Sequence, residues 1–102
     1  MRESGNLSEP HFEKLADSFK VLSDPLRLKI VNCLYHKEKC VNELVEETGA
    51  RQSNVSKHLG ILADHDVVER RKIGLYVYYR LSDGFLVEML KFAINKKEEL
   101  IE

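Results

Sequence analysis

The sequence predicts a mainly α-helical fold with a β-hairpin wing: a winged helix-turn-helix of about five helices. Two short amphipathic helices follow one another over residues 41–64, a tight turn separates them, and a basic β-rich segment follows at 67–81. The length of 102 residues and the 43% hydrophobic content suit one domain with one core. We therefore expect a single winged-helix domain over residues 1–102.

Both helices of the predicted pair carry one apolar stripe. In the first helix, Val41, Leu44 and Val45 recur at helical spacing, and Gly49 supplies a left-handed stop. The second helix resumes the 3.6-residue period after Arg51. Its apolar positions are Val55, Leu59 and Leu62. The wing that follows has two β-rich arms around residues 72–74.

Three further helices flank this unit. Ser8 is a suitable N-cap for a helix over 8–22, Asp24 caps a second helix that begins at Pro25, and a last helix runs over 84–102. Residues 1–7 are polar, and we expect a disordered arm there. A charged loop is expected at 36–39. The positions expected to be buried are Phe12, Leu15, Ala16 and Phe19 in the first helix and Leu26, Ile30, Val31, Cys33 and Leu34 in the second.

The terminal helices carry more apolar residues than one small domain can bury. We therefore expect helices 8–22 and 84–102 to join two copies of the chain in a homodimer with an isologous two-fold interface. Such a dimer places two copies of the helix at 52–64 about 34–36 Å apart, one turn of DNA. The alternative is a terminal helix that folds back on its own domain.

Positive charge is gathered in one part of the chain. The formal net charge is −1, yet residues 51–80 hold six Lys/Arg against three Asp/Glu. This clustering predicts contact with the phosphates of double-stranded DNA. We see no signal peptide, and no apolar run approaches the roughly 18 residues of a membrane span. The expectation is a cytoplasmic protein without a membrane partner.

The motifs of an enzyme are missing from the sequence. It has no Cys-x-x-Cys pair, no Gly-rich phosphate loop and no nucleophile–base pair at a readable spacing, so we expect neither an enzyme nor a cofactor. A winged-helix module that binds another protein stays open. That module predicts weak, salt-insensitive DNA binding, whereas a DNA-binding regulator predicts a steep salt dependence.

The chain resembles the ArsR/SmtB family of winged-helix transcriptional repressors over about residues 15–83. The segments that carry the resemblance are LSDPLRLKIVNCL and VNELVEETGARQSNVSKHLGILADHDVVERRKIGLYVYYRLSD, with SDPLRLKI, VSKHL and RRKIGLYVYYRL as the most specific parts. Members of that family are homodimeric repressors that leave their operators when a metal ion, an arsenical or a redox signal reaches them. The resemblance implies a homodimeric repressor that binds double-stranded operator DNA.

The resemblance also places base-contacting residues on the polar side of the second helix. They are Gln52, Ser53, Asn54, Ser56, Lys57 and His58. The chemistry agrees, since amide side chains pair with adenine, hydroxyls donate or accept, and lysine reaches guanine or a phosphate. Arg51 stands where the family usually has a Ser or Thr N-cap, at a position suited to a phosphate. An ordinary solvated helix face is the alternative for this stripe.

The wing residues have two interpretations as well. Arg70, Arg71 and Lys72 suit phosphate or minor-groove contact, and the alternative is a solubilising hairpin edge. Tyr76, Tyr78 and Tyr79 are expected to pack across the strands, with alternate rings toward the core. Arg27 is expected to form a salt bridge on the second helix rather than to contact the DNA backbone.

Both metal sites familiar in the family lack ligands in this chain. One site uses Cys-x-Cys at the start of the third helix, and here Asn42 replaces the second cysteine. The other site pairs Asp-x-His with His-x-x-Glu across the dimer, and here Phe85 and Lys96 replace the histidines. We therefore expect no metal site of either kind.

Two cysteines remain as candidates for sensing. Cys33 is expected on the inward face of its helix, and Cys40 at the start of the next helix, where Lys37 and Lys39 favour a thiolate. A disulfide, a polysulfide bridge or a soft metal at Cys33 and Cys40 is one hypothesis for release from DNA. The alternatives are a core cysteine, a bystander thiol and a regulator without an inducer.

Overall fold

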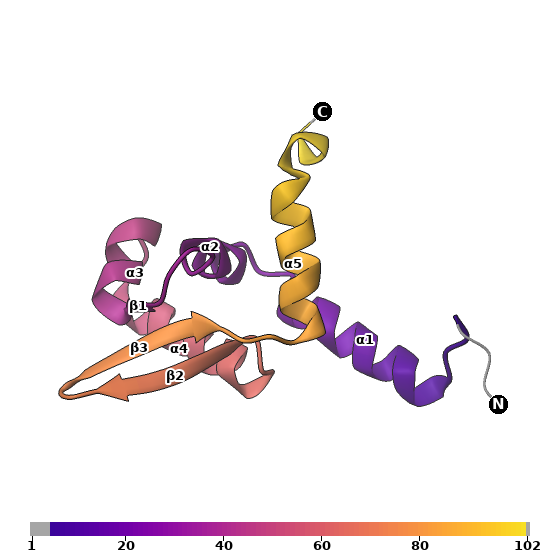
Figure 1. Cartoon of the computed structure of the whole chain (residues 1–102), viewed down its shortest axis with the longest axis horizontal. Helices are drawn as coiled ribbons and strands as arrows, with labels where there is room; N and C mark the ends of the chain where they lie inside the picture. Colours follow the sequence, from indigo (N-terminus) through magenta and orange to yellow (C-terminus); the bar gives the residue numbers. More distant parts are fainter. Residues whose placement is uncertain (1–4, 102) are drawn as a thin grey trace.

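The computed structural model describes residues 5–101 and confirms the five predicted helices around a small sheet (Figure 1). In chain order the elements are α1 (Glu9–Val21), α2 (Pro25–Cys33), β1 (Lys39–Cys40), α3 (Val41–Thr48), α4 (Gln52–Asp64), β2 (Val68–Ile73), β3 (Tyr76–Leu81), α5 (Phe85–Asn95) and a short 3-10 helix η1 (Lys97–Leu100). Of the arm expected at 1–7, residues 1–4 lie outside the described residues.

The helix boundaries follow the predicted caps. The Asp24 carboxylate accepts hydrogen bonds from the backbone N–H groups of Leu26 (2.8 Å) and Arg27 (3.2 Å) at the start of α2. These bonds, the one from Arg27 foremost, hold the pKa of Asp24 below its ordinary value. Gly49 ends α3 with a left-handed φ of 74°, a conformation that costs glycine little.

One core joins α2, α3, α4 and the base of the wing. The apolar stripe predicted for α4 is confirmed, because Val55, Leu59 and Leu62 are fully buried. In the α3 stripe Leu44 is fully buried, while Val41 and Val45 are partly buried against the core. The core also includes Val21, Ile30, Val31, Leu34, Leu44, Val67, Val68, Leu86 and Val87. The core therefore fixes α4 by its apolar side and leaves its polar side outward.

The sheet has one strand more than the predicted hairpin. Its order is β1-β3-β2, fully antiparallel, and β1 pairs Lys39 with Tyr79 and Cys40 with Tyr78. The loop expected at 36–39 was therefore too long, since Lys39 belongs to a strand. A strand of two residues leaves no alternating pattern in the sequence. Gly74, with φ of 61°, opens the two-residue turn between β2 and β3, as in a type II′ hairpin.

Helices α1 and α5 project from the winged-helix body in different directions (Figure 1). The radius of gyration is 15.2 Å, against about 13 Å for a compact domain of this length. The expectation that Phe12, Ala16 and Phe19 are buried is wrong within one chain, since Ala16 is exposed and the two rings are 51% and 52% exposed. Only Ser18 and Val21 of α1 are buried, because just the end of this helix reaches the core.

The last helix is shorter than the predicted range 84–102. Helix α5 ends at Asn95, and the charged segment after it forms the single 3-10 turn η1. The polar sequence beyond Asn95 offers no apolar stripe that could hold a longer helix against the body. Among residues 5–101, no helix has the length and apolar character needed to cross a bilayer.

Candidate nucleic-acid interface

The outward side of α4 is a row of small and polar side chains. Its members Gln52, Ser53, Asn54, Ser56 and Lys57 are all exposed. The same helix is anchored by three fully buried apolar residues, so this polar row is held on a rigid element. Five of the six base-contacting candidates on α4 thus lie together on one accessible surface, which we call the α4 polar row.

The first turn of α4 is open to an anion. Arg51 occupies the N-cap position, its side chain forms no capping hydrogen bond, and the first turn contains no acidic residue. The first backbone N–H groups of a helix have no partner within the helix, and the helix dipole favours negative charge there. This arrangement suits a phosphate at the beginning of the α4 polar row.

His58, the sixth candidate on α4, lies at the edge of that row and is half-buried. Its Nδ1 accepts a hydrogen bond from Nε of Arg27 at 3.0 Å, and Nη1 of Arg27 donates to the Val21 carbonyl at 2.9 Å. The salt bridge expected for Arg27 is therefore wrong: its partners are an imidazole and a carbonyl oxygen. Arg27 connects α2 with the end of α1 and with α4.

The three adjacent cations of β2, Arg70, Arg71 and Lys72, differ in their surroundings. Arg71 is paired with Glu38 through Nη2–Oε2 (2.6 Å) and Nε–Oε1 (3.3 Å). The Arg70 guanidinium lies 6.0 Å from the centroid of the Tyr79 ring. Because side chains alternate along a strand, Arg70 and Lys72 share one face of β2 and Arg71 lies on the other. No pattern in the sequence indicates Glu38 as the partner of Arg71, since the two residues are far apart in the chain.

The wing tyrosines follow the predicted alternation. Tyr79 packs against the core, while Tyr76 near the tip is 65% exposed. Tyr78 is half-buried beside Arg71 on the other face of the hairpin. These rings mainly hold the wing together, as expected.

Cys33 lies in a small polar cluster between α2 and α3. Burial raises the pKa of the Cys33 thiol, and the hydrogen bond and negative charge of Glu47 raise it further. Lys39 Nζ lies 2.7 Å from Glu47 Oε1, which holds the pKa of Glu47 below its ordinary value. The thiol of Cys33 is thus held in its protonated form. The sequence did not indicate Glu47 as a partner of Cys33. Its position near the end of α3 is not enough to predict this contact.

Cys40 is the N-cap residue of α3 and the last residue of β1. Its backbone N–H donates to Glu43 Oε1 at 3.0 Å, and its side chain faces the Glu43 backbone N–H, which completes a capping box. Both Cys33 and Cys40 are free and half-buried. Within residues 5–101, no group of three or more His, Cys, Asp and Glu side chains is arranged to hold a metal ion.

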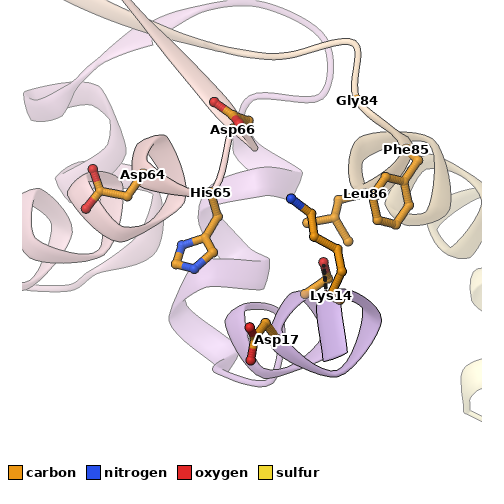
Figure 2. Close-up of a pocket in the computed structure, with 9 residues that line it drawn as sticks. Lys14, Asp17, Asp64, His65, Asp66, Gly84, Phe85 and Leu86 are labelled. Atoms are coloured by element: carbon orange, nitrogen blue, oxygen red, sulfur yellow. Dashed lines mark hydrogen bonds between the residues drawn. The ribbon is translucent and has the colours of Figure 1, made fainter. Parts of the chain in front are cut away.

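A separate pocket of about 340 Å³ lies between α1, the turn after α4 and the start of α5. Figure 2 shows Lys14 reaching from α1 toward the turn that carries His65 and Asp66. His65 ends α4, and its Nδ1 donates to the Ile61 carbonyl at 3.0 Å. His65 is therefore a helix-end residue, and the pocket is not part of the α4 polar row.

Comparison with known proteins agrees with this geometry. Residues 24–70 match the family described as "Bacterial regulatory protein, arsR family". The chain is 36% identical over 84 residues to the cadmium resistance transcriptional regulatory protein CadC of Listeria innocua, a match covering 81% of this chain and 71% of that protein. It is 32% identical over 82 residues to the biofilm growth-associated repressor of Xylella fastidiosa, covering 80% of this chain and 72% of that one.

Solved structures show the same fold. The transcriptional repressor BigR from Xylella fastidiosa superposes with a TM-score of 0.80 at 28% identity, covering 92% of this chain and 93% of that one. Reduced HlyU from Vibrio cholerae superposes with a TM-score of 0.77 at 29% identity, covering 83% and 90%. The chain belongs to the ArsR/SmtB family of winged helix-turn-helix DNA-binding transcriptional regulators, which are not enzymes.

Proposed function

We propose that this chain works as a homodimeric repressor whose two α4 helices enter successive major grooves of a double-stranded operator. The observation that carries the proposal is the α4 polar row: five accessible small or polar side chains on a helix fixed from behind by its buried side. Amide, hydroxyl and ammonium groups are those that distinguish base edges in the major groove. A repressor acts on DNA, so this role also places the chain in the cytoplasm.

Contacts to the DNA backbone would flank the α4 polar row. Arg51 and the open first turn of α4 suit one phosphate, and Arg70 and Lys72 on one face of the wing suit a neighbouring phosphate or the minor groove. Arg71 can join them by exchanging Glu38 for a phosphate, because an exposed ion pair adds little stability. His58 belongs to the same interface through the ring nitrogen that Arg27 does not occupy.

The dimer is proposed from the exposed apolar faces of α1 and α5. Phe12 and Phe19 on α1 are about half exposed, and Phe92 on α5 is 65% exposed. Both helices project from the body (Figure 1), and these three rings stay exposed within one chain. A second copy supplies the same faces, and a two-fold interface covers both pairs of helices at once. These exposed faces favour the dimer over the alternative of a terminal helix folded back on its own domain.

The regulatory part of the proposal is a thiol response at Cys33 and Cys40, with Cys40 as the first site of attack. Cys33 is protected by its burial and by the carboxylate of Glu47, which both disfavour its thiolate. Cys40 joins β1, which pairs with the wing strand β3, to the first turn of α3. Oxidation or persulfidation of Cys40 would remove its part in the cap and disturb both elements of the DNA-binding unit.

Substitution of Asn54 by alanine tests the proposed interface. We expect Asn54→Ala to weaken binding to a selected duplex by about 10- to 100-fold, the range of a lost bidentate base contact, without changing dimerisation. Asn32→Ala removes an exposed amide from α2 and serves as the matched control. Anisotropy titrations at several salt concentrations give both affinity and salt dependence. Unchanged affinity for Asn54→Ala, or salt-insensitive binding of the unaltered protein, would favour a protein-interaction module instead.

A further inference from the structure

Arg27 lies where three helices meet, and its two side-chain hydrogen bonds both lead to other elements. Nη1 donates to the carbonyl of Val21 at the end of α1, and Nε donates to Nδ1 of His58 on α4. The first bond fixes the guanidinium, so that its Nε–H is directed at the imidazole. Asp24, one turn earlier, caps the same helix and adds a nearby negative charge.

The Arg27–His58 bond determines which nitrogen of His58 carries the proton. A guanidinium is always protonated and can only donate, so Nδ1 of His58 must accept. A neutral histidine that accepts at Nδ1 carries its proton at Nε2. His65, at the end of the same helix, has the opposite arrangement because its Nδ1 faces the Ile61 carbonyl.

The remaining nitrogen of His58 is open to solvent. No hydrogen bond within residues 5–101 involves Nε2, and none of the buried side-chain nitrogen and oxygen atoms there lacks a partner. An unbonded Nε2 in a half-buried residue is therefore accessible. His58 follows Asn54 by one helical turn, which places the two side chains next to each other on α4.

We propose that Arg27 is a positioning residue that fixes His58 as an N–H donor at the edge of the α4 polar row, and so sets which base His58 can contact. This inference rests on the proposed function. A donor at Nε2 matches N7 and O6 of guanine, N7 of adenine or a phosphate oxygen, and it rejects the N4 amino group of cytosine. Without Arg27, the ring would sample both tautomers and lose this discrimination.

The tautomer can be measured without DNA. Long-range ¹H–¹⁵N spectra of histidine-labelled protein, recorded at a pH well above the range in which histidines titrate, distinguish a protonated ring nitrogen from a bare one. We expect a proton on Nε2 for His58 and on Nδ1 for His65, which serves as an internal reference. Arg27→Met should give His58 a mixture of tautomers, whereas Lys29→Met, which removes an exposed charge from the same helix, should not. A proton on Nδ1 of His58 in the unaltered protein would overturn the proposal.

The consequence for DNA is tested by selection of bound duplexes from a random pool. His58→Asn keeps an acceptor near the Nδ1 position but has no donor at the Nε2 position, while His58→Gln carries an amide N–H near the Nε2 position. We expect the preference at one base pair per half-site to fall about 3- to 10-fold in Arg27→Met and His58→Asn, the effect of one hydrogen bond, and to recover in His58→Gln. Thermal unfolding of each variant shows whether it is folded, and His58→Asn leaves Arg27 in place.

The outcomes separate this inference from the proposed function. If the unaltered protein enriches a sequence and His58→Asn enriches the same one equally well, the function stands and the role of His58 and Arg27 is refuted. If the unaltered protein enriches nothing, the proposed function fails, and base selection by His58 fails with it. In that case the ¹H–¹⁵N spectra still show whether Arg27 determines the tautomer of His58.

Discussion

Nη2 of Arg71 lies 2.6 Å from Oε2 of Glu38, so one of the three adjacent cations of the wing is already paired within the chain. Both side chains are partly exposed, and an ion pair of this kind exchanges easily with another anion. The pair therefore competes with a phosphate for Arg71. DNA binding by the wing should depend on Glu38 as well as on the arginines.

Removing that competitor should strengthen DNA binding. We expect Glu38→Gln to tighten binding about 2- to 5-fold, because Arg71 is released and a negative charge is removed, and to steepen the salt dependence by about one phosphate contact. Glu98→Gln in η1 removes the same charge far from the wing and should change neither quantity. Anisotropy titrations from low to moderate salt measure both. Equal effects of the two variants would show that Arg71 is not a DNA contact.

Gly60 is an exposed glycine inside α4, and a Cβ built there meets nothing within 4 Å. Because glycine is a poor helix former, Gly60→Ala should raise the free energy of unfolding by about 0.5–1 kcal/mol, measured by urea denaturation. The position lies one turn beyond Ser56, on the side of the α4 polar row. We expect DNA affinity to fall in the same variant, since the methyl group would separate α4 from the duplex. If Gly60→Ala is more stable but binds DNA with unchanged affinity, this part of α4 does not contact the duplex.

The reactivity of Cys33 should depend on Glu47 in addition to its burial. The carboxylate raises the pKa of the thiol, so Glu47→Gln should lower that pKa and leave more thiolate at any given pH. The rate of alkylation of Cys33, followed by mass spectrometry with Cys40 as internal reference, should then reach its half-maximum at lower pH. Glu46→Gln changes an exposed neighbour and should leave the curve in place. If the alkylation of Cys33 has the same pH dependence in Glu47→Gln as in the unaltered protein, the carboxylate does not influence the reactivity of Cys33.

A carboxylate at Phe92 should separate the proposed dimer. We expect Phe92→Glu to raise the dimer dissociation constant by roughly 30-fold or more, because burying an unpaired charge costs at least about 2 kcal/mol. Sedimentation velocity over a concentration series measures this. Leu75→Glu adds the same charge to a leucine that is 94% exposed at the tip of the wing and should stay dimeric. A dimer of normal strength in Phe92→Glu would place the interface elsewhere.

The sequence predicted the elements that depend on local chemistry. Residue type and spacing predict the Asp24 cap, the left-handed Gly49 and the buried side of α4, and the structure confirms all three. The strand β1 was missed because two residues have no period, and its pairing with Tyr78 and Tyr79 depends on a segment almost forty residues away.

The misplaced residues are those whose surroundings lie outside their own segment. The apolar face of α1 was correctly seen as apolar, yet Phe12 and Phe19 are not buried within one chain. The partners of Arg27, Arg71 and Cys33 could not be predicted either, because the packing of different helices and strands brings them close. Spacing rules hold within an element and do not predict such contacts.

Selection of duplexes from a fully random pool by the purified, unaltered protein, followed by sequencing, tests the proposed dimeric repressor most directly. A dimer with two outward α4 helices predicts an enriched inverted repeat whose half-site centres are about 10–10.5 base pairs, or a multiple of that spacing, apart. Enrichment of a single unrepeated half-site, or of no sequence at all, would contradict it.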